Sequence, residues 1–477
     1  MPSNSRRPRR QWFAAAALTA LCVLALAACG RDGYPNSTFH RTTEFNTAIS
    51  SLWDRLLFLG TVVFVIVEGL LVYTVVRFRS KPGAREPRHV HGNTTLEILW
   101  TAIPAVILVF IAVPTVRTIF RTQAKAVSSA LQVEVIGHQW WWEFRYPQYG
   151  VITANELYLP VGRTVNFSLR TNDVLHSFWI PRLGGKRDLI ANHTNYLWFT
   201  VNDSLAADGG TPLNGSCNEY CGTSHANMKF RVFTVPAADF AAWVAHQQTP
   251  AAFGTAAPAA ATTPAPAAPA AGTANRPATS GGDVALATAA QAPATTKTAA
   301  AQPQKQQPTP PAAGAAAAVS GNPLGAATQG QTTAALVPEQ KYMAFPREKL
   351  QGYNLPNTPL PNIPFDSTRK GDPTRGQTAF LLGGCVGCHA IKGNPIAVGN
   401  IGPNLTHIGS RYTIAGAQYP NDTEHLVRWI KNARLMKPGS QMPTLGKGQI
   451  DPVTKAKAGI LDDQQIADVV AYLQALK

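Results

Sequence analysis

Four side chains with soft or borderline metal-binding atoms fall within residues 217–228, namely Cys217, Cys221, His225 and Met228. Cys217 and Cys221 are close enough in the chain for both sulfurs to bridge a pair of metal ions, and the other two side chains follow at loop spacing as terminal ligands. Thiolate, imidazole and thioether together select copper over hard cations. Two alternatives stay open here: tetrahedral zinc, although such sites favour Cys and His over Met, and a disulfide, which is common in oxidising compartments.

A second chemical motif lies near the end of the chain, where Cys385-Val-Gly-Cys388-His389 has the pattern of covalent c-type haem attachment. Both cysteines would form thioether bonds, and His389 would be the proximal ligand of the iron. A thioredoxin-like redox pair is the alternative, and the adjacent His and the lack of a βαβ pattern disfavour it. The other cysteines lie in the leader and in the copper segment, so no cysteine is left for a structural disulfide.

The surrounding residues 366–477 predict an all-α class I cytochrome c domain. Its segments Gly402-Pro-Asn-Leu405 and Lys437-Pro-Gly-Ser-Gln-Met442-Pro resemble class I cytochromes c, which implies Met442 as the distal ligand of the haem. Met436 is the rival ligand. An amphipathic C-terminal helix is predicted from apolar residues at helical spacing, which are Ile466, Val469, Val470 and Leu473.

The copper segment resembles a known family signature. Its pattern Cys217-x-Glu219-x-Cys221-x-x-x-His225-x-x-Met228 is similar to the dinuclear CuA site of cytochrome c oxidase subunit II, and Asp173-Val-Leu-His176 resembles the segment that supplies that family's remote histidine. The resemblance covers roughly residues 40 to 247. It implies a copper ligand set of His176, Cys217, the backbone carbonyl of Glu219, Cys221, His225 and Met228.

Three consecutive tryptophans, Trp140, Trp141 and Trp142, follow Gly137-His-Gln. We expect Trp141 and Trp142 to pack in the interior, because large aromatic side chains in strands usually do. Trp140 aligns with the family tryptophan that passes electrons from a docked donor to CuA, so the resemblance implies an electron-transfer role. This chain carries its own haem domain, which leaves open whether an external donor docks at that tryptophan.

Residues 1–29 have the pattern of a lipoprotein signal peptide, with a basic start, an apolar stretch and Leu26-Ala-Ala-Cys29, which resembles a bacterial lipobox. Plain cleavage after a small residue is the alternative. A transmembrane hairpin is predicted at residues 45–122, because the apolar segments 52–76 and 96–120 are each close to the roughly 20 residues that cross a bilayer. Arg and Lys fill the loop between them, which places the loop in the cytoplasm and both ends of the hairpin outside.

Two carboxylates accompany these segments. Glu68 lies inside the first, where it would face a partner or a polar path, or be protonated and bonded to a neighbouring helix. Thr94-Thr-Leu-Glu97 fits a capping box at the start of the second helix. In the resembling family, a Glu in the pattern Glu97-Ile-Leu-Trp100 lies at the mouth of a proton path into the partner subunit. Both a cap and a proton entry are therefore expected of Glu97.

Residues 128–247 predict an all-β domain, with strand patterns at 131–135, 164–169, 196–201 and 230–235. Short strands separated by turns favour a cupredoxin-like Greek-key sandwich. Residues 248–340 are rich in Ala and Pro and have few large apolar side chains, which predicts a disordered linker. A flexible linker of roughly 90 residues spans about 50 Å. We therefore expect the haem domain to move on it between an outside donor and the copper site.

The formal net charge is +16, and many Lys and Arg lie in the leader and in the loop between the apolar segments, so the charge indicates membrane topology and disfavours nucleic acid as a partner. We interpret the chain as subunit II of a bacterial haem-copper oxidase with a fused cytochrome c, carrying one dinuclear CuA and one covalent haem c. It would be an electron-entry subunit, while oxygen reduction and proton translocation belong to subunit I. Expected partners are subunits I and III and a donor, either cytochrome c or a quinol-cytochrome c reductase. The expected location is the bacterial inner membrane, with both cofactor domains on the periplasmic side.

Three rival functions are weighed against this interpretation. A nitrous oxide reductase would need a further histidine-rich copper centre, and the 11 histidines are too scattered. A quinol oxidase subunit II would keep the fold without the copper ligands, which are intact in this chain. A stand-alone electron-transfer or copper-delivery protein would not need the membrane hairpin with Glu97.

Overall fold

The computed structural model of the chain describes residues 36–79, 83, 91–123, 126–205, 210–251, 344–350 and 358–477. The expected signal peptide and nearly all of the expected linker lie outside these described residues. The described residues belong to one compact unit. This unit contains a helical hairpin, a β-sandwich domain (residues 126–251) and a C-terminal helical domain (residues 358–477).

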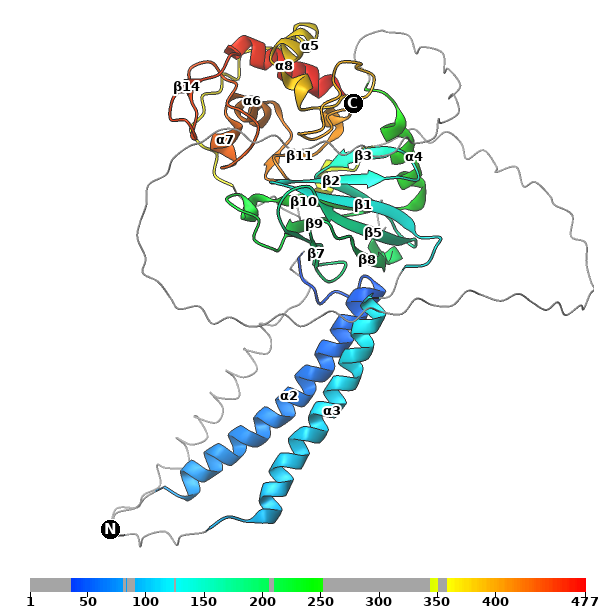
Figure 1. Ribbon diagram of the computed structural model, residues 1–477, viewed down its shortest axis with the longest axis vertical. Coiled ribbons are helices and arrows are strands. Elements are labelled where there is room, and N and C mark those ends of the chain that lie inside the picture. Colours follow the sequence, from blue (N-terminus) through cyan, green and yellow to red (C-terminus); the bar gives the residue numbers. More distant parts are fainter. Residues whose placement is uncertain are drawn as a thin grey trace, which may run out of the picture. The chain divides into compact units, whose positions relative to one another are not determined.

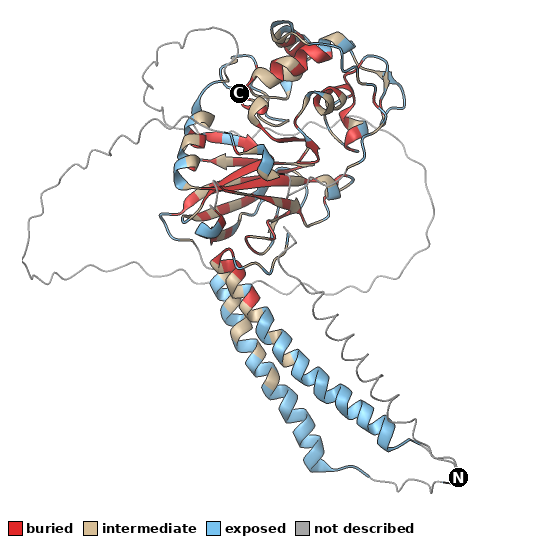
Figure 2. Ribbon diagram, turned by 180° about the vertical axis from the view of Figure 1, so that it is seen from behind, coloured by how far each residue is buried: buried red, intermediate tan, exposed pale blue. Residues whose placement is uncertain are grey.

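The hairpin consists of two long helices, α2 (Glu44–Arg77) and α3 (Thr94–Gln123), which lie side by side (Figure 1). Figure 2 shows that most of their length is exposed. Apolar side chains exposed over such a length are unfavourable in water and suit a bilayer. Both helices are long and apolar enough to cross a membrane. The prediction of two membrane segments is thus confirmed, and each expected span lies within a longer helix.

The start of α3 differs from the expected capping box. Asn93 caps the helix, because its Oδ1 accepts hydrogen bonds from the backbone N–H of Thr95 at 3.1 Å and of Leu96 at 3.2 Å. Thr94 is already the first helical residue, so Glu97 is not placed to complete a box with it. The capping explanation of Glu97 is therefore wrong, because the Asn one position earlier supplies the same type of cap.

Two five-stranded sheets form the sandwich domain (Figure 1). In spatial order, the first sheet contains β3 (Val151–Ala154), β2 (Trp141–Tyr146), β1 (Leu131–His138), β5 (Thr164–Thr171) and β8 (Asn195–Thr200). The second sheet contains β4 (Glu156–Pro160), β10 (Lys229–Val235), β9 (Thr211–Cys217), β6 (His176–Trp179) and β7 (Arg187–Leu189). The pairs β1 with β5 and β4 with β10 are parallel, and the other pairs are antiparallel. The strands expected from the sequence are present as β1, β5, β8 and β10.

Aromatic rings fill the space between the two sheets. Phe178 and Phe230 from the second sheet stack with ring centroids 5.0 Å apart, and Trp142 from the first sheet meets Phe230 at 5.4 Å. All three side chains are fully buried. Burying one such ring contributes on the order of 2–3 kcal/mol. Because this core lies directly under β6 and β9, it fixes the strand ends that carry His176 and Cys217.

The first turn of α2 joins the hairpin to the sandwich. Glu44 accepts hydrogen bonds from the backbone N–H and the hydroxyl of Thr200 in β8, at 2.9 and 2.8 Å. Phe45 is buried over Gly185, where a Cβ would lie 2.9 Å from the ring. A short helix, α4 (Ala237–Gln248), covers the other side of the core through Trp243, which stacks on Tyr158 at 4.5 Å.

The C-terminal domain is built on helices α5 (Pro373–Leu382), α6 (Thr423–Lys431), α7 (Ala433–Met436) and α8 (Asp463–Ala475). Its loops also form two-residue strands, which are β11 (Thr413–Ile414), β12 (Tyr419–Pro420), β13 (Gln449–Ile450) and β14 (Lys457–Ala458). The expected helical class is confirmed. The predicted amphipathic helix is α8, whose four expected apolar residues are all buried.

The crossing of α5 and α8 requires a glycine. A Cβ on Gly376 would lie 1.9 Å from the carbonyl oxygen of Asp468. Beside this contact, Arg375 donates to both carboxylate oxygens of Asp468, at 2.8 and 2.9 Å. The missing side chain allows the two backbones to approach, and the bidentate pair fixes their register.

We expect Gly376→Ala to destabilise the C-terminal domain by about 1–3 kcal/mol or more, because the added methyl forces the two helices apart. Denaturant unfolding of the full chain, followed by near-ultraviolet circular dichroism, measures the change. Gly387→Ala is the control, since its added Cβ would meet nothing within 4 Å. Equal midpoints for the two variants would contradict the prediction.

Candidate copper and haem sites

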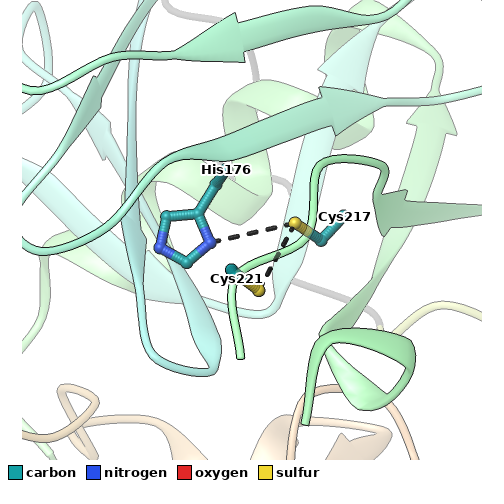
Figure 3. Close-up of side chains that lie close together, drawn as sticks. All are labelled: His176, Cys217 and Cys221. Atoms are coloured by element: carbon teal, nitrogen blue, oxygen red, sulfur yellow. Dashed lines mark hydrogen bonds between the residues drawn. The ribbon is translucent and has the colours of Figure 1, made fainter. Parts of the chain in front are cut away.

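Separate strands bring the copper-ligand candidates together. His176 is the first residue of β6, Cys217 is the last residue of β9, and Cys221 lies in the loop between β9 and β10. Their ligand atoms all lie within 4.8 Å of one another. Figure 3 shows the imidazole of His176 and the sulfur of Cys221 both facing the sulfur of Cys217.

The two sulfurs are close but not bonded. The Sγ atoms of Cys217 and Cys221 are 3.8 Å apart, and both residues are free cysteines. A disulfide bond is only about 2.05 Å long. The structure therefore favours two independent thiol ligands over the disulfide alternative.

Each sulfur has two further donor atoms beside it. Cys217 Sγ lies 3.8 Å from His176 Nδ1 and 3.3 Å from the Glu219 carbonyl oxygen, while Cys221 Sγ lies 3.6 Å from His225 Nδ1 and 3.9 Å from Met228 Sδ. All six predicted ligands thus meet in one cluster. Two central sulfurs, each with an imidazole and one further donor, exceed what one tetrahedral zinc ion takes and suit soft copper.

Asp173 fixes the orientation of His176 and has no role in the sequence prediction. Its Oδ1 lies 2.8 Å from His176 Nε2, and its Oδ2 accepts a hydrogen bond from the backbone N–H of Gln139 at 2.6 Å. Because Asp173 occupies Nε2, the other ring nitrogen, Nδ1, faces the sulfurs. Metal-ligating histidines are commonly oriented by a carboxylate in this way. The spacing Asp173-Val-Leu-His176, with an acceptor three residues before a ligand, is the signal that could have found it.

The two thiols affect each other's ionisation. The pKa of Cys217 is lowered, first because the Cys221 thiol donates to its sulfur and also because His176 lies beside it. The pKa of Cys221 is raised, chiefly by the same interaction with Cys217 and by burial. One thiolate forms readily while the second is opposed by the first. A bound metal would supply positive charge that favours the thiolate form of both cysteines.

Trp140 contacts the cluster through one backbone carbonyl. Its Nε1 donates to the carbonyl oxygen of Cys221 at 2.9 Å, and the side-chain amide of Gln139 donates to the same oxygen at 2.8 Å. Trp142 is fully buried in the core, as expected. Trp141 is partly buried and stacks on His138, with centroids 4.1 Å apart. Trp140 and Trp142 both donate to carbonyl oxygens of the copper segment, Trp140 to Cys221 at 2.9 Å and Trp142 to Met228 at 3.5 Å.

A pocket at the face between the C-terminal and sandwich domains is lined by the predicted haem residues Cys385, Cys388, His389 and Met442, and also by Trp140 of the sandwich. Apolar side chains such as Phe380 and Trp429 complete its walls, as the flat face of a porphyrin requires. Met436 does not line this pocket, and its carbonyl oxygen accepts a hydrogen bond from Tyr419. The geometry thus favours Met442 over its rival.

His389 is oriented toward this pocket by its backbone partner. Its Nδ1 lies 2.8 Å from the carbonyl oxygen of Pro403, which can only accept, so Nδ1 carries the proton and Nε2 keeps its lone pair. Burial lowers the pKa of His389 and keeps the imidazole neutral. Cys385 begins a short 3₁₀ turn after α5, without the βαβ unit of a thioredoxin-like motif. These features fit an iron ligand on a c-type haem.

Comparisons with known proteins identify the family of the domains that contain these residues. Three family models match: the transmembrane domain of cytochrome c oxidase subunit II at residues 41–118, its periplasmic domain at residues 151–235, and cytochrome c at residues 373–477. A probable cytochrome c oxidase subunit 2 of Rickettsia bellii is 33% identical over 42% of this chain and 80% of its own length. The chain belongs to the cytochrome c oxidase subunit II family.

Two further relatives are cytochrome c oxidase subunits 2 of Alkalihalophilus pseudofirmus and Bacillus subtilis. The first is 40% identical over 38% of this chain and 53% of its own length, and the second is 36% identical over 47% and 66%. The chain thus spans between about half and two thirds of the length of these relatives. With the periplasmic domain of this family and a cytochrome c domain, it combines a copper domain with a haem c domain behind a membrane anchor.

We expect Asp173→Ala to lower the affinity for copper by about 10- to 100-fold, because His176 loses the acceptor that orients its ring. Competition with a chelator of known copper affinity measures the change in the purified chain. Asp173→Asn keeps an acceptor oxygen and should bind nearly as well as the parent. Asp203→Ala, at an exposed carboxylate, is the control. Unchanged affinity in Asp173→Ala would show that another contact holds His176.

Proposed function

We propose that this chain is the electron-entry subunit of a respiratory cytochrome c oxidase in a bacterial inner membrane. Its haem c would take electrons from cytochrome c or a quinol-cytochrome c reductase and pass them to a dinuclear copper site. That site would reduce the haem of subunit I, where oxygen is reduced to water with proton translocation. The observation that carries the proposal is the six-donor cluster around the Cys217 and Cys221 sulfurs, joined in one chain to a haem pocket.

The proposed ligands are His176, Cys217, Glu219, Cys221, His225 and Met228 for copper, and Cys385, Cys388, His389 and Met442 for one covalent haem c. Two copper ions are favoured because each sulfur has its own imidazole and its own second donor. Sulfurs that bridge two copper ions would share the charge of one electron between them. A frame of two packed sheets keeps those ligands in place when that electron arrives and leaves, so little rearrangement is required.

The proposed topology puts both cofactor domains on the periplasmic side. The basic loop after α2 favours the cytoplasm for the turn of the hairpin. The start of α2 and the end of α3 then lie at the outer surface, where Glu44 and Thr200 join helix to sandwich. Subunits I and III are the proposed neighbours in the membrane, and the long exposed apolar faces of α2 and α3 are available to them.

Removal of haem c tests the electron order. We expect Cys385→Ala with Cys388→Ala to prevent reduction of copper by the natural donor, while a small reductant still reduces it. The complementary variant Cys217→Ser should keep haem c reducible, lose the two-copper paramagnetic signal and stop onward transfer. Stopped-flow absorbance of both centres measures the rates. The order is wrong if the haem-free variant respires on the natural donor as fast as the parent.

Glu97 is proposed as the entry to a proton path. It lies in the first turn of α3, where Asn93 already supplies the cap, so its carboxylate is available for another role. A carboxylate at the edge of a membrane segment can exchange protons with water and with a polar path in a neighbouring subunit.

We expect Glu97→Gln to slow turnover of the assembled oxidase while transfer from haem c to copper stays fast, because the amide cannot carry the proton. Oxygen consumption and flash-induced electron transfer give the two rates. Asn93→Ala is the matched control, since it weakens the start of the helix without removing the carboxylate. If the Glu97→Gln variant turned over as fast as the parent protein, Glu97 would not be the entry to a proton path.

A further inference from the structure

A buried lysine of the haem domain reaches into the copper domain. Lys437 is only 3% exposed, and its ammonium group donates to the carbonyl oxygen of Trp140 at 2.5 Å and to that of Ala415 at 2.9 Å. The next residue, Pro438, accepts a hydrogen bond from the hydroxyl of Ser224 in the copper loop. The segment of residues 437–439 therefore touches the copper domain just before the chain reaches Met442. We call it the docking loop.

The docking loop lies against the indole of Trp140. A Cβ on Gly439 would be 2.5 Å from the Cζ3 and Cη2 atoms of that ring, and the residue has φ +85°, so both the space and the backbone favour glycine. On its other edge, Trp140 donates to the carbonyl oxygen of Cys221. A continuous series of contacts thus leads from the haem domain through one tryptophan to a copper-ligand candidate.

A buried carboxyl group of the copper domain, that of Glu156, binds in turn to the haem domain. Glu156 begins β4 of the copper domain and is 3% exposed. Its Oε1 accepts hydrogen bonds from the backbone N–H of Tyr412 at 2.8 Å and of Thr413 at 3.0 Å, and from the Thr413 hydroxyl at 3.2 Å. All three donors belong to the haem domain. Buried Arg411 of the haem domain and Arg231 of the copper domain provide the positive charge nearby.

Apolar and linker contacts enlarge the same interface. The ring of Tyr412 lies 5.2 Å from that of Phe233 in β10, and its hydroxyl donates to the carbonyl oxygen of Phe345 at 2.7 Å. At the other end, the backbone N–H of Ala251 donates to the carbonyl oxygen of Lys392 at 3.0 Å. Ala251, before the linker, therefore contacts the haem domain, and Phe345, after it, contacts both Phe233 of the copper domain and Tyr412 of the haem domain.

We propose that Lys437 and Glu156 are positioning residues that hold the haem domain on Trp140, so that haem c delivers its electrons to copper from a docked position. The inference rests on the proposed electron order and specifies how it is carried out. A buried polar or charged group is unfavourable unless it is paired, and the donors of the three hydrogen bonds to Glu156 Oε1 all belong to the other domain. If the domains separated, the Lys437 and Glu156 side chains would be hydrated by water. In the docked position each of them has hydrogen-bond partners in the opposite domain.

The docked position also determines which electron donor can contact Trp140. The docking loop covers one part of the indole, so a soluble donor cannot contact that part while the haem domain is seated. Electrons from an external donor would therefore enter through haem c. The linker would then serve to attach the haem domain, and the domain would not have to move over a long distance. A haem domain that stays seated in this way would not need to move between donor and copper.

Two anchor variants test the inference in the assembled, cofactor-loaded protein. Lys437→Met removes the ammonium group from the haem side, and Glu156→Ala removes the acceptor from the copper side. Lys447→Met, at an exposed lysine of the same domain, is the control. After flash photoreduction of haem c, we expect transfer to copper to slow about tenfold or more in both anchor variants and not in the control, because breaking a buried interdomain pair mainly speeds dissociation.

Hydrogen exchange gives an independent readout that needs no electron transfer. The backbone N–H groups of Tyr412 and Thr413 should be protected in the parent and the control, and should exchange faster in both anchor variants. Haem absorption and the copper paramagnetic signal should be unchanged, which separates loss of docking from damage to either site. Equal transfer rates in parent and anchor variants, or unprotected Tyr412 and Thr413 in the parent, would overturn the inference. Absence of transfer in the parent itself would instead overturn the proposed electron order.

Discussion

The close approach of two unbonded cysteine sulfurs is the constraint on which the copper domain depends. At 3.8 Å, Cys217 and Cys221 are too far apart for a disulfide and too close for two free thiolates without a cation. The chain satisfies this constraint by placing one sulfur at the end of β9 and the other in the following loop. Strand pairing and a packed aromatic core then prevent either from moving away. A bound metal would supply positive charge at these sulfurs, and the sandwich holds the ligand residues in place.

The carbonyl oxygen of Cys221 links this centre to the rest of the unit. It accepts hydrogen bonds from Gln139 and Trp140, so the loop between β1 and β2 holds the copper loop in position. The same Gln139 donates its backbone N–H to Asp173, which orients His176. One short loop therefore supports both ends of the ligand cluster. A change at this loop would reach the copper ligands even though no ligand belongs to it.

The two cofactor domains are joined by charges that each domain buries for the other. Glu156 of the sandwich is matched by backbone N–H groups of the haem domain, and Lys437 of the haem domain by a carbonyl oxygen of the sandwich. The fold of one domain alone does not provide these hydrogen-bond partners, because they belong to the other domain. Such reciprocal pairing gives orientation more than raw affinity. Orientation is what electron transfer between two fixed centres requires.

The sequence by itself determined the chemistry and the main elements. Ligand types and spacing in 217–228 and in Cys385 to His389 are local, and so are the apolar runs that became α2 and α3. It could not reveal the Asn93 cap, where two neighbouring polar residues compete within one turn, or the role of Asp173, which depends on where a side chain points. Only the tertiary structure decided that Glu156 meets Tyr412 and that Lys437 meets Trp140. These partners are hundreds of residues apart, and no periodicity along a chain encodes which distant surfaces fit together.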